Sequence, residues 1–266
     1  MYITHDYCEN TEPTSLRILC EDYIYHNSGM IQVSVPEGCV VYDALIVVNG
    51  EIPSLKFWQG LLYRTIICTD GAANTLRDFS ITPDIIIGDM DSISDSPLNA
   101  TAMEGLKEHF STATIHHLSE QHSTDFEKAL NYALQQQYKR ILCLGILGKS
   151  ADHGLYNLNL LNRYSQHMEI MALNTFEDSR QWIFRLGQNM RIHTKKHNIV
   201  SFFPFPEATL SSQGLIWELS STLLTQSGKG AIRNRANAES LVLSCQGDCL
   251  CFLISEEIPQ LVTTKS

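Results

Sequence analysis

Two aspartates, Asp89 and Asp91, follow a buried apolar run and carry the clearest chemistry in the sequence. The run, Ile85 to Ile87, breaks at Gly88. Continuous β-branched runs are typical of parallel strands covered on both faces, and ligands bind beyond the carboxyl ends of such strands. Because alternate residues of an extended segment point the same way, both carboxylates could converge on one hard cation. The pattern predicts a site for Mg²⁺ and phosphate, although an isolated Gly-Asp-x-Asp-Ser fits a plain turn equally well.

A second expected strand, residues 65–68, also delivers a carboxylate, Asp70. Gly71 and the residues after it open an expected helix from Ala72, and the free N–H groups at a helix start attract phosphate. Since the strand ends of a parallel sheet cluster in space, Asp70 weakens the interpretation of the first loop as a mere turn.

A third carboxylate, Asp125, lies near the start of an expected helix. Asp125 and Lys128 are three residues apart and therefore share one helix face. Taken alone, the structural explanation is better: Thr124 and Glu127 fit a capping box, and Asp125 suits the helix dipole. In the functional interpretation, Asp125 is a third metal ligand and Lys128 supplies positive charge for a phosphate.

Two further loops follow expected strands. Asn49 and Gly50 come after the run at 44–48, and Lys149 lies in a glycine loop after the run at 140–144. An ordinary strand-to-helix turn with Asp152 as N-cap explains most of the second loop. His153 is given no role as a base.

Strand, glycine loop and helix recur up to about residue 170, which predicts an α/β domain with a mainly parallel sheet. Beyond it, short apolar runs separated by Pro and Gly predict an antiparallel sandwich. The predicted fold is therefore an α/β, mainly parallel-sheet nucleotide-binding domain followed by an all-β sandwich. Its parts are an extension of unknown role at 1–40, a catalytic domain at 41–170 and the sandwich at 171–266.

Composition restricts the function. The chain of 266 residues has a formal charge of −10, which argues against a broad nucleic-acid surface. None of the eight cysteines forms a CxxC pair, so reduced thiols are expected. The sequence shows neither a secretory signal nor an apolar stretch of membrane-spanning length, so we expect a cytoplasmic protein without a membrane partner.

In the β-rich half, Asn234 lies among glycines and basic residues that usually indicate a hairpin. Trp217 and Phe252 lie on expected strands, so core packing is the default for both.

Together these segments resemble the thiamine pyrophosphokinase family. The resemblance spans about residues 42–254 and rests on the order and spacing of motifs that are individually weak. They are NGE at 49–51, DGAAN at 70–74, PDIIIGDMDS at 83–92, QxxTDFEKAL at 121–130, Asp-His at 152–153, GLxWxL at 214–219 and Asn-Arg-Ala at 234–236.

The resemblance implies transfer of the terminal pyrophosphate of ATP to the hydroxyl of thiamine, giving thiamine diphosphate and AMP. It implies a homodimer with thiamine at the subunit interface, and candidate thiamine contacts at Asn234 and Phe252. The implied metal ligands, for Mg²⁺, are Asp89, Asp91 and Asp125, with Lys128 as a further catalytic residue. The residues expected to bind ATP are Asn49, Gly50, Asp70, Gly71, Asn74, Ser92, Gln121, Thr124, Lys149 and Asp152.

Two departures from the family pattern leave alternatives open. Ser150 stands where the family usually has an arginine, and His122 where an acidic residue is common. One alternative is a diverged nucleotide-binding or regulatory protein with little turnover. Another is a diphosphokinase that acts on a different primary alcohol.

Overall fold

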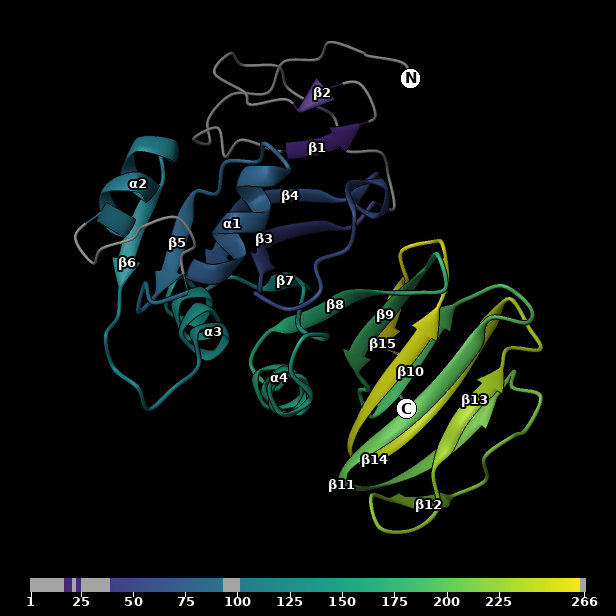
Figure 1. The fold of residues 1–266 in the computed structure, drawn as a ribbon. Coiled ribbons are helices and arrows are strands. Elements are labelled where there is room, and N and C mark those ends of the chain that lie inside the picture. Colours follow the sequence, from purple (N-terminus) through teal and green to yellow (C-terminus); the bar gives the residue numbers. More distant parts are fainter. Residues whose placement is uncertain (1–16, 21–22, 25–38, 93–100, 264–266) are drawn as a thin grey trace.

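The computed structural model of this chain describes residues 17–20, 23–24, 39–92 and 101–263. It is an α/β structure dominated by one large β-sheet, which in the described residues has fifteen strands (Figure 1). The predicted α/β class is thereby confirmed.

The first half of the sheet is parallel in the order β6-β5-β4-β3-β7-β8. The inner strands form because their apolar runs are buried on both faces, as in residues 85–88 of β5, whereas β6 lies at the edge and is partly exposed. Their bounds are β3 (Val41–Val47), β4 (Leu62–Thr69), β5 (Ile85–Gly88), β6 (Thr114–His117), β7 (Arg140–Leu144) and β8 (Glu169–Phe176).

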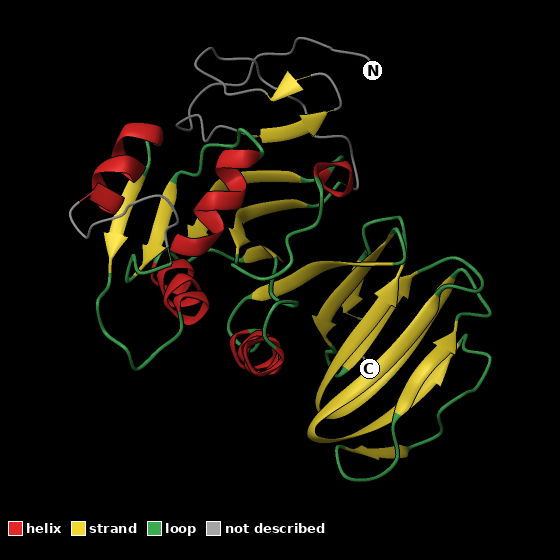
Figure 2. Ribbon diagram, viewed as in Figure 1, coloured by secondary structure: helices red, strands yellow, loops and turns green. Residues whose placement is uncertain are grey.

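Helices cover both faces of this parallel part (Figure 2). Apolar residues of α1 (Asp70–Asp78) and α2 (Thr101–His109) pack on one face, and those of α3 (Asp125–Gln135) and α4 (Ala151–Tyr164) on the other. Each face has its own apolar cluster, so the sheet is a two-sided core that holds the strand ends in fixed positions.

Three expected elements differ in detail. The helix expected over 55–62 is a short 3₁₀ turn, η1 (Leu55–Trp58), because the chain must extend again into β4. Helix α1 begins at Asp70 and not at Ala72. The helix expected from 95 to 110 is described only as α2, because residues 93–100 lie outside the described residues.

The second half of the sheet is antiparallel and continues from the first through the pairing of β8 with β9. The long strands β11 and β14 pair along most of their length, with a register shift between Pro204 and Ala208. The first part of β14 pairs with β10, and its last part pairs with β9. The bounds are β9 (Ser179–Arg185), β10 (Asn189–His193), β11 (Ile199–Gln213), β12 (Thr222–Thr225), β13 (Ala231–Arg235), β14 (Ser240–Ile254) and β15 (Leu261–Thr263).

After α4 ends at Tyr164 the described residues form strands from β8 onward, and the antiparallel pairing begins with β9. The two halves are hydrogen-bonded into one continuous sheet, and their division into separate domains stays a prediction. At the N-terminus, β1 (Arg17–Cys20) pairs antiparallel with β2 (Tyr23–Ile24) and with the start of β4. No helix in the described part of the chain combines the length and apolar character needed to cross a membrane.

Candidate functional site

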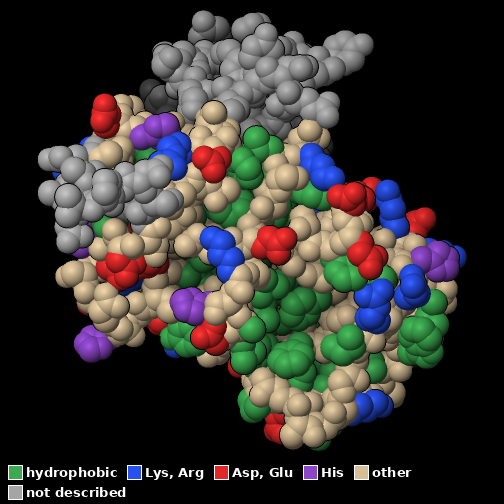
Figure 3. All heavy atoms as spheres, in the orientation of Figure 1, with side chains coloured by type: hydrophobic (Ala, Val, Ile, Leu, Met, Phe, Trp, Pro, Cys, Tyr) green, Lys and Arg blue, Asp and Glu red, His purple; other side chains and the backbone are tan. Residues whose placement is uncertain are grey.

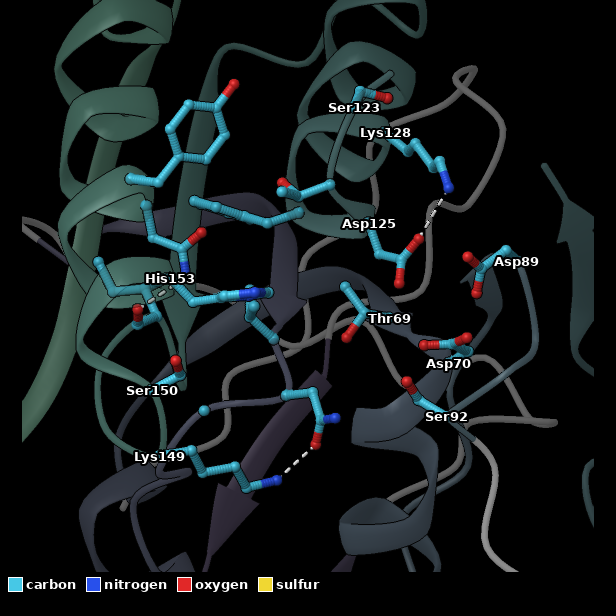
Figure 4. Close-up of a pocket in the computed structure, with 18 of the residues that line it drawn as sticks. Thr69, Asp70, Asp89, Ser92, Ser123, Asp125, Lys128, Lys149, Ser150 and His153 are labelled. Atoms are coloured by element: carbon cyan, nitrogen blue, oxygen red, sulfur yellow. Dashed lines mark hydrogen bonds and ion pairs between the residues drawn. The ribbon is translucent and has the colours of Figure 1, made fainter. Parts of the chain in front are cut away.

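A cavity of about 610 Å³ opens where the carboxyl ends of the parallel strands meet. This volume is within the usual range for sites that bind small molecules. Its walls come from the loops after β3, β4, β5, β6 and β7 and from the first turns of α3 and α4 (Figure 4).

Three carboxylates, those of Asp70, Asp89 and Asp125, each place an oxygen within 4.8 Å of the other two. Asp70 is buried as the first residue of α1, and the N–H of Gly71 donates to its Oδ1 at 2.5 Å. Its Oδ2 is buried without a hydrogen-bond partner among the described residues. A Cβ on Gly88 would lie 2.7 Å from the Asp70 side chain, so only glycine leaves room for this carboxylate.

The electrostatics of the cluster are unfavourable without a cation. Burial, and next the charge of Asp125, raises the pKa of Asp70 to about 7. Partial burial opposes ionisation of Asp89, but hydrogen bonds from Gln121 and from Asp91 lower its pKa. The Gln121 side-chain amide donates to Asp89 Oδ2 at 2.7 Å. The cluster thus contains one carboxylate with a raised pKa, Asp70, beside one whose pKa hydrogen bonds lower, Asp89.

Lys128 lies beside the cluster. Its Nζ is 3.0 Å from Asp125 Oδ1, and only 4% of its side chain is exposed. Both residues belong to the first turns of α3, whose N-cap is Thr124: its hydroxyl accepts from the N–H of Glu127 at 3.3 Å. The predicted cap is therefore present, but the Glu127 carboxylate binds residues of α4 and does not complete the box.

Asp91 lines the cavity but is not a member of the three-carboxylate group. Met90 between Asp89 and Asp91 has φ of +66°, so this segment is not in the extended conformation that the sequence argument assumed. The Asp91 carboxylate instead accepts from the Ser92 hydroxyl at 3.0 Å. Asp70 joins Asp89 and Asp125 in the three-carboxylate group, and the ligand role of Asp91 stays a prediction.

On the opposite wall, Lys149 donates to the side-chain oxygen of Asn49 at 2.6 Å and thereby joins the loops after β3 and β7 (Figure 4). The cavity contains most of the predicted site residues. These are Asn49, Gly50, Asp70, Asp89, Asp91, Ser92, Gln121, Thr124, Asp125, Lys128 and Lys149.

Three predicted ATP contacts lie outside the cavity lining and support it. The Asn74 amide donates to the backbone oxygen of Ser92 at 3.1 Å. A Cβ on Gly71 would collide with the Asn49 amide at 2.0 Å. Asp152 follows the actual N-cap, Ser150, and accepts from its hydroxyl.

The two predicted thiamine contacts also lie outside the cavity. Asn234 is buried and holds the backbone of Trp217, accepting from its N–H at 3.2 Å and donating to its oxygen at 2.7 Å. Phe252 packs against the core that α3 and α4 share with the sheet. The expectation that Trp217 is a core residue is wrong: its side chain is 61% exposed, because it lies in the loop after β11.

Comparisons with known proteins find one family that is similar to this chain. Residues 57–172 match the family model described as the catalytic domain of thiamin pyrophosphokinase. Thiamine pyrophosphokinase 2 of Arabidopsis thaliana is 28% identical, covering 86% of this chain and 92% of the relative. Residues 57–172 of the chain thus resemble the catalytic domain of the thiamine pyrophosphokinase family.

Solved structures from this family share the fold. The crystal structure of thiamine pyrophosphokinase from Bacillus subtilis has a TM-score of 0.65 at 24% identity, covering 81% of this chain and all of that one. The thiamin pyrophosphokinase from Candida albicans also has a TM-score of 0.65, at 17% identity, covering 80% of this chain and 89% of that one.

The three-carboxylate group has the properties of a divalent-cation site. All its donors are oxygens, which suits a hard cation. The unpartnered, buried Oδ2 of Asp70 lacks the hydrogen bond that a buried polar atom normally makes. A bound cation would supply the missing partner and offset the mutual repulsion of the carboxylates.

Eleven residues that line the cavity were not among the predicted site residues. They are Val48, Thr69, His122, Ser123, Phe126, Ile146, Gly148, Ser150, His153, Tyr156 and Asn157. The last three lie on one face of α4 at spacings of three and four residues, which is the signal that could have identified them.

Proposed function

We propose that this chain is a thiamine pyrophosphokinase, which transfers the terminal pyrophosphate of ATP to the hydroxyl of thiamine and releases AMP. The observation that carries the proposal is the group formed by Asp70, Asp89 and Asp125 beside Lys128 in the cavity. All four residues lie inside the segment that matches the family's catalytic domain.

The proposed roles follow from charge and position. In the reaction, the hydroxyl oxygen of thiamine bonds to the β-phosphorus of ATP, while the bond from that phosphorus to the α–β bridging oxygen breaks. The hydroxyl proton is released, and either Asp125 or Asp91 accepts it. Transfer of this kind depends mainly on positioning and charge neutralisation. Lys128 and Lys149 supply the positive charges of the cavity for the phosphates.

We assign the metal to Mg²⁺, held by Asp70, Asp89 and Asp125, with Asp91 beside them. When bound, Mg²⁺ would neutralise charge on the β- and γ-phosphates. Gln121 orients Asp89 through its hydrogen bond, and Ser92 orients Asp91.

The proposed thiamine site involves the antiparallel half of the chain. All residues that line the described cavity precede residue 158, so the antiparallel half of the same chain contributes none. Apolar side chains gather on the face where α4 meets the antiparallel strands (Figure 3). Trp217 and Ile232 are each 61% exposed. These features support the proposal of a homodimer in which a second copy completes the thiamine site. The thiamine contacts of Asn234 and Phe252 and the cytoplasmic location stay predictions.

One assay tests the function. The purified protein is incubated with Mg²⁺, ATP and thiamine, and nucleotides and thiamine esters are separated by chromatography. We expect AMP and thiamine diphosphate in equal amounts. AMP formed only with another primary alcohol would indicate a diphosphokinase that acts on that alcohol. No AMP with any alcohol would indicate a nucleotide-binding protein without turnover. The comparisons favour neither of these alternatives.

A further inference from the structure

A network of polar side chains that the proposed chemistry does not use stands behind one wall of the cavity. Its centre is Glu127 of α3, which accepts from the Tyr156 hydroxyl at 3.0 Å and from the Arg163 guanidinium. Tyr164 lies 3.4 Å from the same carboxylate and donates to Asn131 at 2.7 Å. Glu127 is 14% exposed at its side chain, so its charge is largely enclosed by these partners.

Tyr156 is the member of this network that reaches the cavity. It lines the cavity together with His153, one turn earlier on α4. Its hydroxyl is tied back to Glu127, so the ring is fixed in the wall while the polar tip points away from a ligand. A tethered tyrosine offers a rigid apolar face at low cost in conformational entropy.

This wall lies across the cavity from the carboxylates. Figure 4 shows His153 of α4 on the opposite side from Asp89 and Asp70, with Lys149 on the same side as His153. Apolar side chains accompany Tyr156 among the lining residues, namely Val48, Phe126 and Ile146. The cavity therefore has an acidic side for a cation, with His153 and Lys149 across from it, and its lining also includes the Tyr156 ring and apolar side chains.

We propose that Tyr156, held by the Glu127–Arg163 pair, contacts the purine ring of ATP and sets the enzyme's affinity for the nucleotide. The inference rests on the proposed function and adds the place of the base within the same site. With the phosphates at the carboxylates, the base of the nucleotide extends to the aromatic wall.

The positive charge of Lys149 and the in-line geometry of the transfer favour the nucleotide base over the ring of thiamine at this wall. Thiamine carries a positive thiazolium, which Lys149 would repel, whereas the same lysine attracts the phosphates of a nucleotide. In an in-line displacement the attacking hydroxyl and the leaving AMP lie on opposite sides of the transferred phosphorus. The two rings consequently need different walls, and the aromatic wall beside Lys149 suits the leaving nucleotide.

The Glu127–Arg163 pair makes the tether possible. A buried carboxylate without a partner is costly, and Arg163 offsets its charge while leaving one oxygen for Tyr156. Loss of the Glu127 charge is therefore expected to free the ring without removing it from the cavity.

The test compares variants at Tyr156 in the full-length protein by steady-state kinetics. Tyr156→Leu retains bulk without an aromatic face, and we expect the KM for ATP to rise ~10-fold, from the energy of stacking a base on an aromatic ring. Tyr156→Phe retains the ring without the tether, and we expect a rise of only ~2–3-fold, from loss of one hydrogen bond. The KM for thiamine and kcat are expected to change by less than ~2-fold in both variants.

Asn159→Ala is the matched control, because Asn159 is exposed on the same helix and does not line the cavity. It should leave both KM values unchanged. Binding of Mg-ATP without thiamine, measured by calorimetry, should follow the same order as the KM values, and thermal unfolding should show that the variants are folded.

A larger rise in the KM for thiamine than for ATP would assign the ring to the other substrate and overturn the inference. Equal effects of Tyr156→Leu and Tyr156→Phe would also overturn it, because the aromatic face would then contribute nothing. If the native protein binds Mg-ATP and Tyr156→Leu weakens this binding, but no thiamine diphosphate forms, the proposed function fails while the base contact stands.

Discussion

Replacement of Asp70 by asparagine tests the electrostatic account of the site in the metal-free protein. Asp70 is 1% exposed, and its pKa is raised to about 7. An unfolded aspartate titrates near pH ~4, and each pKa unit corresponds to about 1.4 kcal/mol. The ionised carboxylate therefore costs the metal-free fold up to roughly 4 kcal/mol above pH 7, with coupling to Asp125 and Asp89 reducing this value.

The sign follows from linkage. Because the folded pKa lies above the unfolded one, the contribution of Asp70 to stability is fully present below pH ~4 and is lost as the pH rises towards 7. Asparagine has nearly the same shape and can accept from the Gly71 N–H, but it does not ionise. Asp70→Asn should therefore remove a pH-dependent loss of stability that the native protein has.

The assay is urea unfolding in EDTA at pH 5 and pH 8. We expect the free energy of unfolding of the native protein to fall by roughly 2–4 kcal/mol more than that of Asp70→Asn between these pH values. With Mg²⁺ and ATP added, the native protein should gain stability, and the variant should gain little. Parallel pH profiles, or equal stabilisation of both proteins by Mg-ATP, would refute the reasoning.

Three further predictions follow from the site. Asp89→Asn should lower kcat by ~100-fold or more without lowering the unfolding midpoint, because the side chain is a loop ligand and not core; near-normal turnover would remove Asp89 from the metal site. Mg²⁺ affinity, measured by calorimetry, should rise between pH 6 and pH 8 with release of a proton, since Asp70 must ionise to bind; a flat profile would contradict this role. Asn234→Ala should destabilise the fold by about 1–3 kcal/mol through loss of its bonds to Trp217, while the calorimetric affinity for Mg-ATP stays unchanged.

Local patterns in the sequence predicted the elements that position the site. The run at 85–87, the glycine loops and the cap at Thr124 each have a local physical cause, so the strand ends and the start of α3 could be placed without a structure. The gathering of Asp70, Asp89 and Asp125 followed from the rule that parallel strand ends cluster.

Features that depend on a single backbone angle or on distant contacts could not be predicted. The left-handed conformation of Met90 breaks the extended segment expected between Asp89 and Asp91, and nothing in the local pattern indicates it. The aromatic wall arises because Glu127 leaves its expected capping bond for partners on α4, which is a contact between separate helices. Trp217 was misassigned because a strand-like pattern continues into an exposed loop.

The central claim is that Asp70, Asp89 and Asp125 hold one divalent cation on the phosphates of ATP. A crystal structure with Mn²⁺ and a non-hydrolysable ATP analogue tests it most directly, through the anomalous signal of the metal. The account predicts a peak within coordination distance of all three carboxylates and in contact with the β- and γ-phosphates. A peak bound by Asp89 and Asp91 without Asp70, or a metal elsewhere in the cavity, would contradict it.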